Sequence, residues 1–313
     1  MVKILSDILK PWNIIRRVKE THEIVAELPS HVKWIENYTS SVAGQIESAR
    51  MDLLFLNGQV AARDMPLNLD TIQAAEFRVF SQWSEDGIIQ FLIKRLAGRI
   101  DPSFVEFGVQ HYLESNTLFL LMNNGWRGLV LDGEESYIRG IRNRGFDWKY
   151  GLQTLCAFVS RENINAIFQK GGVGSELGLL SIDVDGIDWH LWEALTLVKP
   201  GIVVIEYNRN FPLDRPITIP YEPLFDRTSA HESRWYFGAS LAALAVLAKE
   251  KGYTFVGVES HRRNAFFVRN DLASLVPNDV PKEAHLDRDT ATVVKALSGL
   301  PVYNVLTKAI EKI

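Results

Sequence analysis

The first part of the chain carries apolar residues spaced alternately four and three positions apart. The series comprises Ile14, Val18, Thr21, Val25, Leu28, Val32, Ile35, Thr39, Val42, Ile46, Ala49, Leu53, Leu56 and Val60. A seven-residue apolar repeat keeps one stripe of a helix facing a partner helix, as in a coiled coil. We therefore predict a helical segment over residues 1–66. It either joins copies of the chain into an oligomer or packs on the main domain of its own chain.

Pro29 interrupts this apolar series. Proline lacks a backbone donor and disfavours helical backbone in the residue before it. The sequence thus predicts a helix break at Leu28–Pro29, with Ser30 capping a second helix.

After Pro66 the pattern changes to short apolar stretches alternating with helical ones, which defines a main domain over residues 67–313. The predicted strands are 104–107, 128–132, 154–159, 177–184 and 202–205, and a helix capped at Ser84 precedes them. Almost wholly apolar strands separated by helices are typical of a parallel sheet covered on both faces. A helix over 241–251 and strands over 254–258 and 265–268 follow. We predict a doubly wound, Rossmann-like α/β fold.

Composition and charge exclude several classes of protein. A net charge of −4 over 313 residues gives no basic surface for nucleic acid, and the single cysteine, Cys156, excludes an intrachain disulfide. No apolar run reaches the roughly 20 residues of a membrane-spanning helix. We expect a cytoplasmic protein. The first twenty residues combine five basic and two acidic side chains with helically spaced apolar ones, which indicates either weak membrane-surface contact or an ordinary terminal helix.

Acidic residues stand where the predicted strands end. Glu106 and Gly108 belong to the end of the first strand, Asp132 ends the second, Asp183 and Asp185 end the fourth, and Glu206 ends the fifth. Ligands of open parallel sheets bind outside the carboxyl ends of the strands. A carboxylate after the second strand suits the two hydroxyls of a ribose, so we assign Asp132 to ribose binding.

The segment after the first strand lacks the further glycines of a dinucleotide fingerprint and the lysine of a phosphate loop. Gly108 is followed instead by Ser115, Asn116 and Thr117, just before an apolar helix over 118–122. One glycine with small polar residues fits a ligand without phosphates. S-adenosylmethionine (SAM) is such a ligand.

Four segments resemble the FkbM-type methyltransferases. They begin at Phe104 (FVEFGV), Gly125 (GWRGLVLDG), Ser181 (SIDVDGID) and Val203 (VVIEYN), and the resemblance spans 81–269. It implies a class I methyltransferase fold and SAM as methyl donor. It also implies that Glu106, Gly108, Asp132, Asp183 and the turn at Ala157 and Phe158 hold the donor. The fourth-strand motif of the family begins with a lysine, and this chain has Ser181 there, which leaves any role of that lysine in doubt.

Methyl transfer to a hydroxyl calls for a base, and histidine has the side-chain pKa nearest neutrality. We expect His231 to act as the base, with Asp185 as the alternative and His111 as a competitor. His231 lies in a stretch from Asn208 to Gly238 that is rich in aromatic residues and proline, which we interpret as an insertion covering the substrate.

Two alternatives remain open at this stage. Asp183, Asp185 and Asp188 could bind magnesium or calcium, although no full calcium-loop pattern surrounds them and we assign no metal. The leading functional hypothesis is a SAM-dependent O-methyltransferase acting on a sugar, glycan or other small hydroxyl acceptor. The alternative is a catalytically degenerate methyltransferase fold that serves as a binding or scaffolding module in polysaccharide assembly.

Overall fold

The computed structural model describes residues 11–278 and 290–313, and the chain divides into two compact units, Met1–Leu54 and Phe55–Ile313. Residues 1–10, and with them the first half of the amphipathic stretch predicted at the N-terminus, lie outside the described residues. Within the described ranges, no helix is long and apolar enough to cross a membrane.

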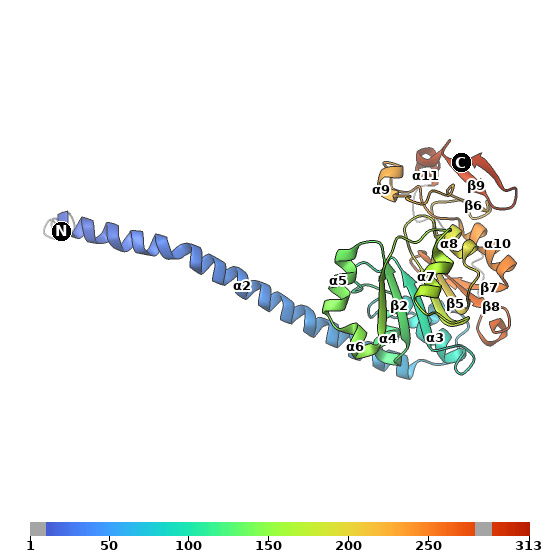
Figure 1. The fold of residues 1–313 in the computed structure, drawn as a ribbon, viewed down its shortest axis with the longest axis horizontal. Coiled ribbons are helices and arrows are strands. Elements are labelled where there is room, and N and C mark those ends of the chain that lie inside the picture. Colours follow the sequence, from blue (N-terminus) through green and yellow to red (C-terminus); the bar gives the residue numbers. More distant parts are fainter. Residues whose placement is uncertain (1–10, 279–289) are drawn as a thin grey trace. The chain divides into compact units, whose positions relative to one another are not determined.

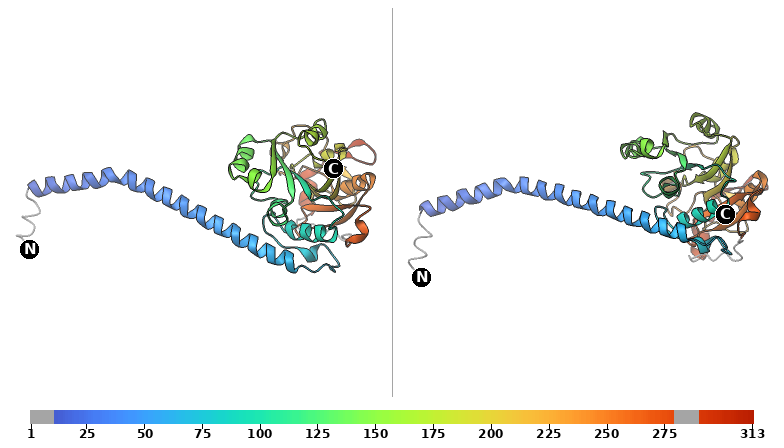
Figure 2. Two further views of the ribbon diagram at one scale, coloured as in Figure 1. Left: turned by 60° about the horizontal axis from the view of Figure 1, so that its bottom comes forward. Right: turned by 90° about the horizontal axis from the view of Figure 1, so that it is seen from below.

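Helix α2 (Pro11–Asp64) runs uninterrupted for 54 residues, so the predicted break at Pro29 is wrong. The Ser30 hydroxyl donates to the Glu27 carbonyl at 2.6 Å instead of capping a new helix. Proline removes its own backbone hydrogen bond and its ring crowds the carbonyl four residues earlier, and the helix accommodates both by bending. Figure 2 shows α2 continuing with a gentle change of direction in its blue part.

The apolar seam of α2 is exposed along much of its length. Val25, Leu28, Val32 and Ile35 each keep half or more of their surface accessible, and Ile46 and Leu53 keep about as much. A seven-residue repeat of exposed branched side chains is the surface that a coiled coil buries.

The last turns of α2 belong to the second unit. The Phe55 ring lies 6.3 Å from that of Phe80 and 5.9 Å from that of Phe119, centroid to centroid. A Cβ at Gly58 would collide with Val79, and Ala62 is buried. The second compact unit thus begins inside the helix, at Phe55.

A seven-stranded sheet forms the centre of this unit (Figure 1). Its strands are β1 (Ser103–Phe107), β2 (Arg127–Asp132), β3 (Leu152–Cys156), β4 (Glu176–Ile182), β5 (Lys199–Glu206), β7 (Tyr253–Val258) and β8 (Asn264–Arg269). Their order is β3-β2-β1-β4-β5-β8-β7. The first five are parallel, and β8 is antiparallel to β5 and β7. This confirms the predicted doubly wound, Rossmann-like sheet with its closing antiparallel pair.

Helices cover the sheet. They are α3 (Glu85–Arg95), α4 (Leu118–Asn124), α5 (Glu135–Asn143), α6 (Phe146–Tyr150), α7 (Ile164–Lys170), α8 (Asp188–Ala194) and α10 (Leu241–Lys251). Helix α3 contacts α4, whereas α8 contacts α7 and α10. The sheet strands β1, β4 and β5 are buried almost throughout, because both faces are covered.

The C-terminal residues form a second, small sheet. Strand β6 (Ile217–Thr218) pairs with β9 (Pro301–Asn304), which pairs with β10 (Ala309–Lys312). Two further pieces are helix α9 (Arg227–Ala230) and helix α11 (Thr290–Leu297). The Tyr236 hydroxyl also donates to the Pro301 carbonyl at 2.5 Å. The C-terminus thus fixes the segment between β5 and α10, the predicted insertion.

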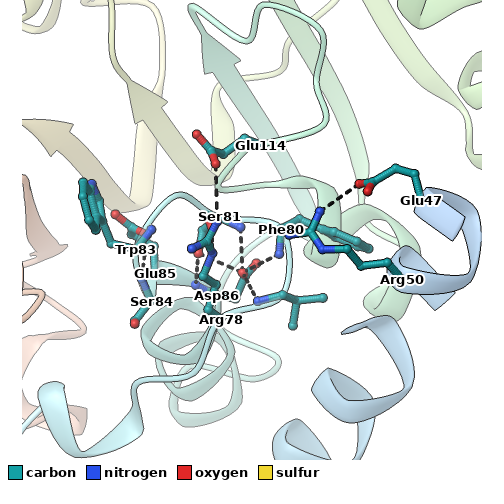
Figure 3. Close-up of polar contacts among 11 residues, drawn as sticks. Glu47, Arg50, Arg78, Phe80, Ser81, Trp83, Ser84, Glu85, Asp86 and Glu114 are labelled. Atoms are coloured by element: carbon teal, nitrogen blue, oxygen red, sulfur yellow. Dashed lines mark hydrogen bonds and ion pairs between the residues drawn. The ribbon is translucent and has the colours of Figure 1, made fainter. Parts of the chain in front are cut away.

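Two buried acids organise the chain before α3 (Figure 3). One oxygen of Asp86 accepts from the backbone amides of Val79, Phe80 and Ser81 at 2.7–2.8 Å. Glu85 accepts from the amides of Trp83 and Ser84. The helix begins where the sequence predicted, but the Ser84 side chain makes no capping bond. The acids in the first turn instead satisfy the amides upstream of the helix.

Candidate functional site

A cleft of about 730 Å³ opens at the carboxyl ends of the parallel strands. Residues at or just after the carboxyl ends of the first five strands line it, which is the position of ligand sites in doubly wound sheets. From β1 to β5 these include Gly108, Asp132, Phe158, Asp183 and Glu206.

The loop after β1 is held in an uncommon backbone conformation. Gly108, Gln110 and Tyr112 all have positive φ, at 70°, 45° and 52°. A Cβ at Gly108 would collide with the Asp183 carbonyl oxygen, so only glycine lets this loop approach β4 so closely. Positive φ at non-glycine residues is typical of functional loops that the surrounding structure over-determines.

Asp132 lies at the end of β2 and lines the cleft, as predicted. Its two oxygens accept from the backbone amides of Gln110 at 2.7 Å and Glu134 at 2.9 Å. These bonds fix the carboxylate and connect β2 to the loop after β1. Each oxygen keeps a second lone pair, so the carboxylate can still accept from a ligand hydroxyl.

Glu106 is buried and fully engaged within the protein. Its oxygens accept from the Ser115 hydroxyl at 2.6 Å, the backbone amide of Asn116 at 2.9 Å and the Thr117 hydroxyl at 2.5 Å. Burial raises the pKa of the Glu106 carboxyl, and these hydrogen bonds oppose the rise. Thr117 is completely buried, and it does not line the cleft, whereas Ser115 and Asn116 do. The network holds the turn that leads into α4.

Three carboxylates meet at the ends of β4 and β5. One oxygen from each of Asp183, Asp185 and Glu206 lies within 4.8 Å of the others. Burial raises the pKa of both Asp183 and Glu206 well above the usual range, and repulsion from the neighbouring acids adds to it. The ionised forms of these carboxyl groups are therefore disfavoured unless a positive charge joins them.

Asp188 does not join this group. Its oxygens accept from the backbone amides of Val184 at 2.8 Å and Gly186 at 2.9 Å, which fixes the loop after β4. Burial raises its pKa to about 6. The trio of Asp183, Asp185 and Asp188 considered from the sequence is thus wrong as a grouping. Glu206, from the neighbouring strand, takes the third place.

The insertion after β5 reaches the cleft through Pro223, Phe225 and Arg227. The Arg227 guanidinium donates to Asp185 at 2.5 Å, and its central carbon lies 3.7 Å from the centroid of the Phe237 ring. Arg227 also donates to the Arg234 carbonyl. This arginine therefore connects the second half of the insertion to the loop after β4.

The histidines are distributed differently from the prediction. His231 hydrogen-bonds the Ser233 hydroxyl at 2.8 Å and is not among the residues that line the cleft. His111 lines the cleft, with its ring 4.5 Å from that of Tyr137. Of the two predicted bases, the structure brings Asp185 to the cleft and leaves His231 outside it.

The lining residues that received no role from the sequence include Arg227, Phe225 and Glu206. The sequence did indicate Glu206, because it is an acid at a strand end. Its grouping with Asp183 could not be predicted, because it depends on which strands are neighbours in the sheet. Phe158 and Ala157 do line the cleft, and the Phe158 ring is 70% exposed.

Neither protein-family models nor curated proteins match the sequence. Among solved structures, the fold is similar to the N-terminal domain of EvdMO1, determined in the presence of S-adenosylhomocysteine (SAH) and D-fucose. The identity is 12% and the TM-score 0.37, covering 67% of this chain and 93% of that one. It is also similar to the CurJ carbon methyltransferase, at 12% identity and a TM-score of 0.39 over 64% and 57% of the two chains. A putative caffeoyl-CoA O-methyltransferase from Staphylococcus aureus has 12% identity and a TM-score of 0.39, over 59% and 82%.

Proposed function

We propose that this chain is a SAM-dependent methyltransferase of the FkbM type that methylates a hydroxyl of a sugar, glycan or other small acceptor. One observation carries the proposal. The cleft at the carboxyl ends of β1 and β2 combines a glycine approached closely by the backbone, Gly108, with a fixed carboxylate, Asp132. A ribose-bearing ligand without phosphates needs both features at these positions.

The charge of the cleft supports a cationic ligand. Seven acids line it, namely Glu85, Glu106, Glu114, Asp132, Asp183, Asp185 and Glu206, against the two arginines Arg227 and Arg263 and no lysine. SAM carries a positive sulfonium centre in addition to its amino-acid group. A dinucleotide would instead bring two phosphates into an acidic cleft, which its electrostatic potential opposes.

The residues divide into a donor side and an acceptor side. In the proposed complex, Asp132 accepts from the ribose hydroxyls and the exposed Phe158 ring stacks on the adenine. Glu106, Ser115, Asn116 and Thr117 hold the donor pocket in shape through their mutual hydrogen bonds. Asp183, which the sequence predicted to hold the donor, is reassigned in this proposal: together with Asp185 and the insertion it faces the acceptor.

The acceptor hydroxyl must lose its proton as the methyl group arrives. We assign the uptake of that proton to Asp185, which lines the cleft, in preference to His231, which does not. The sulfonium is itself activated toward attack, so orientation of the two reactants supplies much of the rate.

We further propose that the exposed seam of α2 joins copies of the chain through a coiled coil. The seam residues named above are at least half exposed and repeat every seven positions. Such a surface is stable in water when a partner helix covers it.

Calorimetric titration of the full chain with SAM, SAH and NAD tests the proposed function. We expect saturable binding of the first two and no binding of NAD. Binding of NAD without binding of SAM or SAH would contradict this proposal and indicate an oxidoreductase. Binding of SAM without turnover on any of a panel of sugar acceptors would favour the non-catalytic module.

A further inference from the structure

The three carboxylates at the ends of β4 and β5 come together because of the strand register. β4 and β5 are parallel, and Ile182 pairs with Ile205, so the next residues, Asp183 and Glu206, stand side by side. Asp185 follows two residues later. One oxygen of each lies within 4.8 Å of the others. Like charges so close, away from bulk water, repel each other unless a positive charge lies among them.

The protein supplies only part of that positive charge. Arg227 pairs with one oxygen of Asp185. Glu206 is only 8% exposed, and its Oε2 accepts no hydrogen bond from any described residue. Buried carboxylate oxygens are nearly always bonded, because leaving one without a partner forfeits its hydration.

The side-chain oxygen of Asn264 is a second buried acceptor without a hydrogen-bond donor. Asn264 pairs with Glu206 across β5 and β8, lines the cleft and is 6% exposed. Its amide group donates to Glu85 at 2.7 Å, while its Oδ1 accepts no hydrogen bond within the described parts of the chain. Unpaired acceptors on two neighbouring strands indicate a ligand that attracts oxygen atoms.

We propose that Asp183, Asp185 and Glu206 bind a divalent cation of the oxygen-preferring class, Mg²⁺ or Mn²⁺. The cluster offers carboxylate oxygens alone, without the histidine or cysteine ligands that favour zinc or copper. Such cations are held by a few carboxylates and keep several water ligands. Those remaining positions open into the cleft, where a second molecule can replace the water.

One consequence rests on the proposed function, whereas metal binding itself does not. On the acceptor side, a cation at this site would bind oxygens of the acceptor and lower the pKa of its hydroxyl. Water in the cleft would then be a strong enough base, and Asp185 would act as a ligand of the cation instead of taking the proton. The geometry points to an acceptor with two neighbouring oxygens, such as the adjacent hydroxyls of a sugar.

The test uses the full chain, stripped of metal with a chelator and titrated with Mn²⁺ alone, with free Mn²⁺ measured by electron paramagnetic resonance. We expect one saturable site. Glu206→Gln and Asp183→Asn should each weaken Mn²⁺ binding at least about tenfold, since each removes a charged ligand. Glu114→Gln is the matched control. Glu114 also lines the cleft but stands outside the cluster, so this variant should bind as the wild type does.

Thermal unfolding of the same samples shows that each variant folds. Without metal, Glu206→Gln should unfold at or above the wild-type temperature, because it removes a repelling charge. The same Mn²⁺ concentration should raise the unfolding temperature of the wild type more than that of Glu206→Gln. Absence of saturable binding to the wild type, or equal binding by wild type and Glu206→Gln, would overturn the proposal. Protons shared among the three carboxyl groups would then relieve their repulsion in place of a cation. Because no SAM is present, a failure of the proposed function leaves this result unaffected.

Discussion

The Arg227 guanidinium lies 2.5 Å from the carboxylate of Asp185, a residue 42 positions earlier in the chain. Asp185 itself has a positive φ of 56°. The pair joins the insertion after β5 to the loop after β4, on the side of the cleft assigned to the acceptor.

Replacing Arg227 should therefore affect the acceptor more than the donor. In Arg227→Ala we expect the affinity for SAH to stay within about twofold, because the donor side is formed by β1 and β2. Chymotryptic cleavage within the insertion should become faster, since the replacement removes its ties to Asp185 and Phe237. Arg127→Ala, which removes an exposed ion pair to Asp101 outside both the cleft and the insertion, separates this effect from a general loss of charge. A large loss of SAH affinity in Arg227→Ala would place the donor on the insertion side.

Asp132→Ala should weaken SAH binding by about 1–3 kcal/mol, the cost of losing a charge-assisted hydrogen bond to the ribose. Calorimetric titration measures the loss, and thermal unfolding checks that the loop around Gln110 still folds. Asp147→Ala, on exposed helix α6, is the matched control and should bind SAH normally. Unchanged affinity in Asp132→Ala would limit this carboxylate to fixing the backbone.

Two truncations test where the globular unit begins. A chain starting at Phe55 should fold with nearly full stability, whereas a chain starting at Arg63 lacks the packing of Phe55 against Phe80 and Phe119. We expect the shorter chain to be less stable by about 2–5 kcal/mol, as for loss of a large buried side chain. Denaturant unfolding measures the difference.

Both truncations remove most of the apolar seam. We expect light scattering to give a smaller assembly for each than for the full chain. The same assembly size in all three would place the contact between copies in the globular unit.

Asp86→Ala should lower the free energy of unfolding by about 3 kcal/mol or more. The replacement leaves the amides of Val79, Phe80 and Ser81 without their acceptor, and each buried unpaired group costs about 1–3 kcal/mol. Glu114→Ala provides the comparison. Its ion pair with Arg78 is exposed, so the change should stay within about 0.5 kcal/mol. Similar values for the two variants would contradict the role assigned to Asp86.

His190 should make the protein sensitive to acid. Burial lowers the pKa of its imidazole from 6.5 to about 4, although a hydrogen bond to the Ile219 carbonyl opposes the shift. The folded state therefore holds His190 neutral while the unfolded chain takes up a proton below pH 6.5. The resulting stability is fully present above pH 6.5 and is lost as the pH falls toward 4, by roughly 3 kcal/mol.

The comparison for His190 is His190→Gln, which keeps a donor for Ile219 and does not titrate. Denaturant unfolding at pH 7, 6, 5 and 4 should show the wild type losing more stability than the variant over this range. Parallel curves would mean that the imidazole is hydrated in the folded protein.

The sequence by itself determined the sheet and the positions of its strand ends. Short apolar strands in alternation with helices specify a buried parallel sheet, because an apolar residue at nearly every position requires cover on both faces. The acids at strand ends followed from the same pattern. The positions of Asp132 and Asp183 at the cleft could therefore be predicted without knowing the order of the strands.

Tertiary structure alone decided which of those acids meet. Asp183 groups with Glu206 because β4 and β5 are neighbours in register, whereas Asp188, closer in sequence, is taken up by backbone amides. One local signal failed without any long-range packing. Helix α2 continues through Pro29, because a long helix accommodates a proline by bending. His231 lies outside the cleft and Arg227 inside it, because the fold of the insertion depends on contacts with β9 and the loop after β4 that no local pattern encodes.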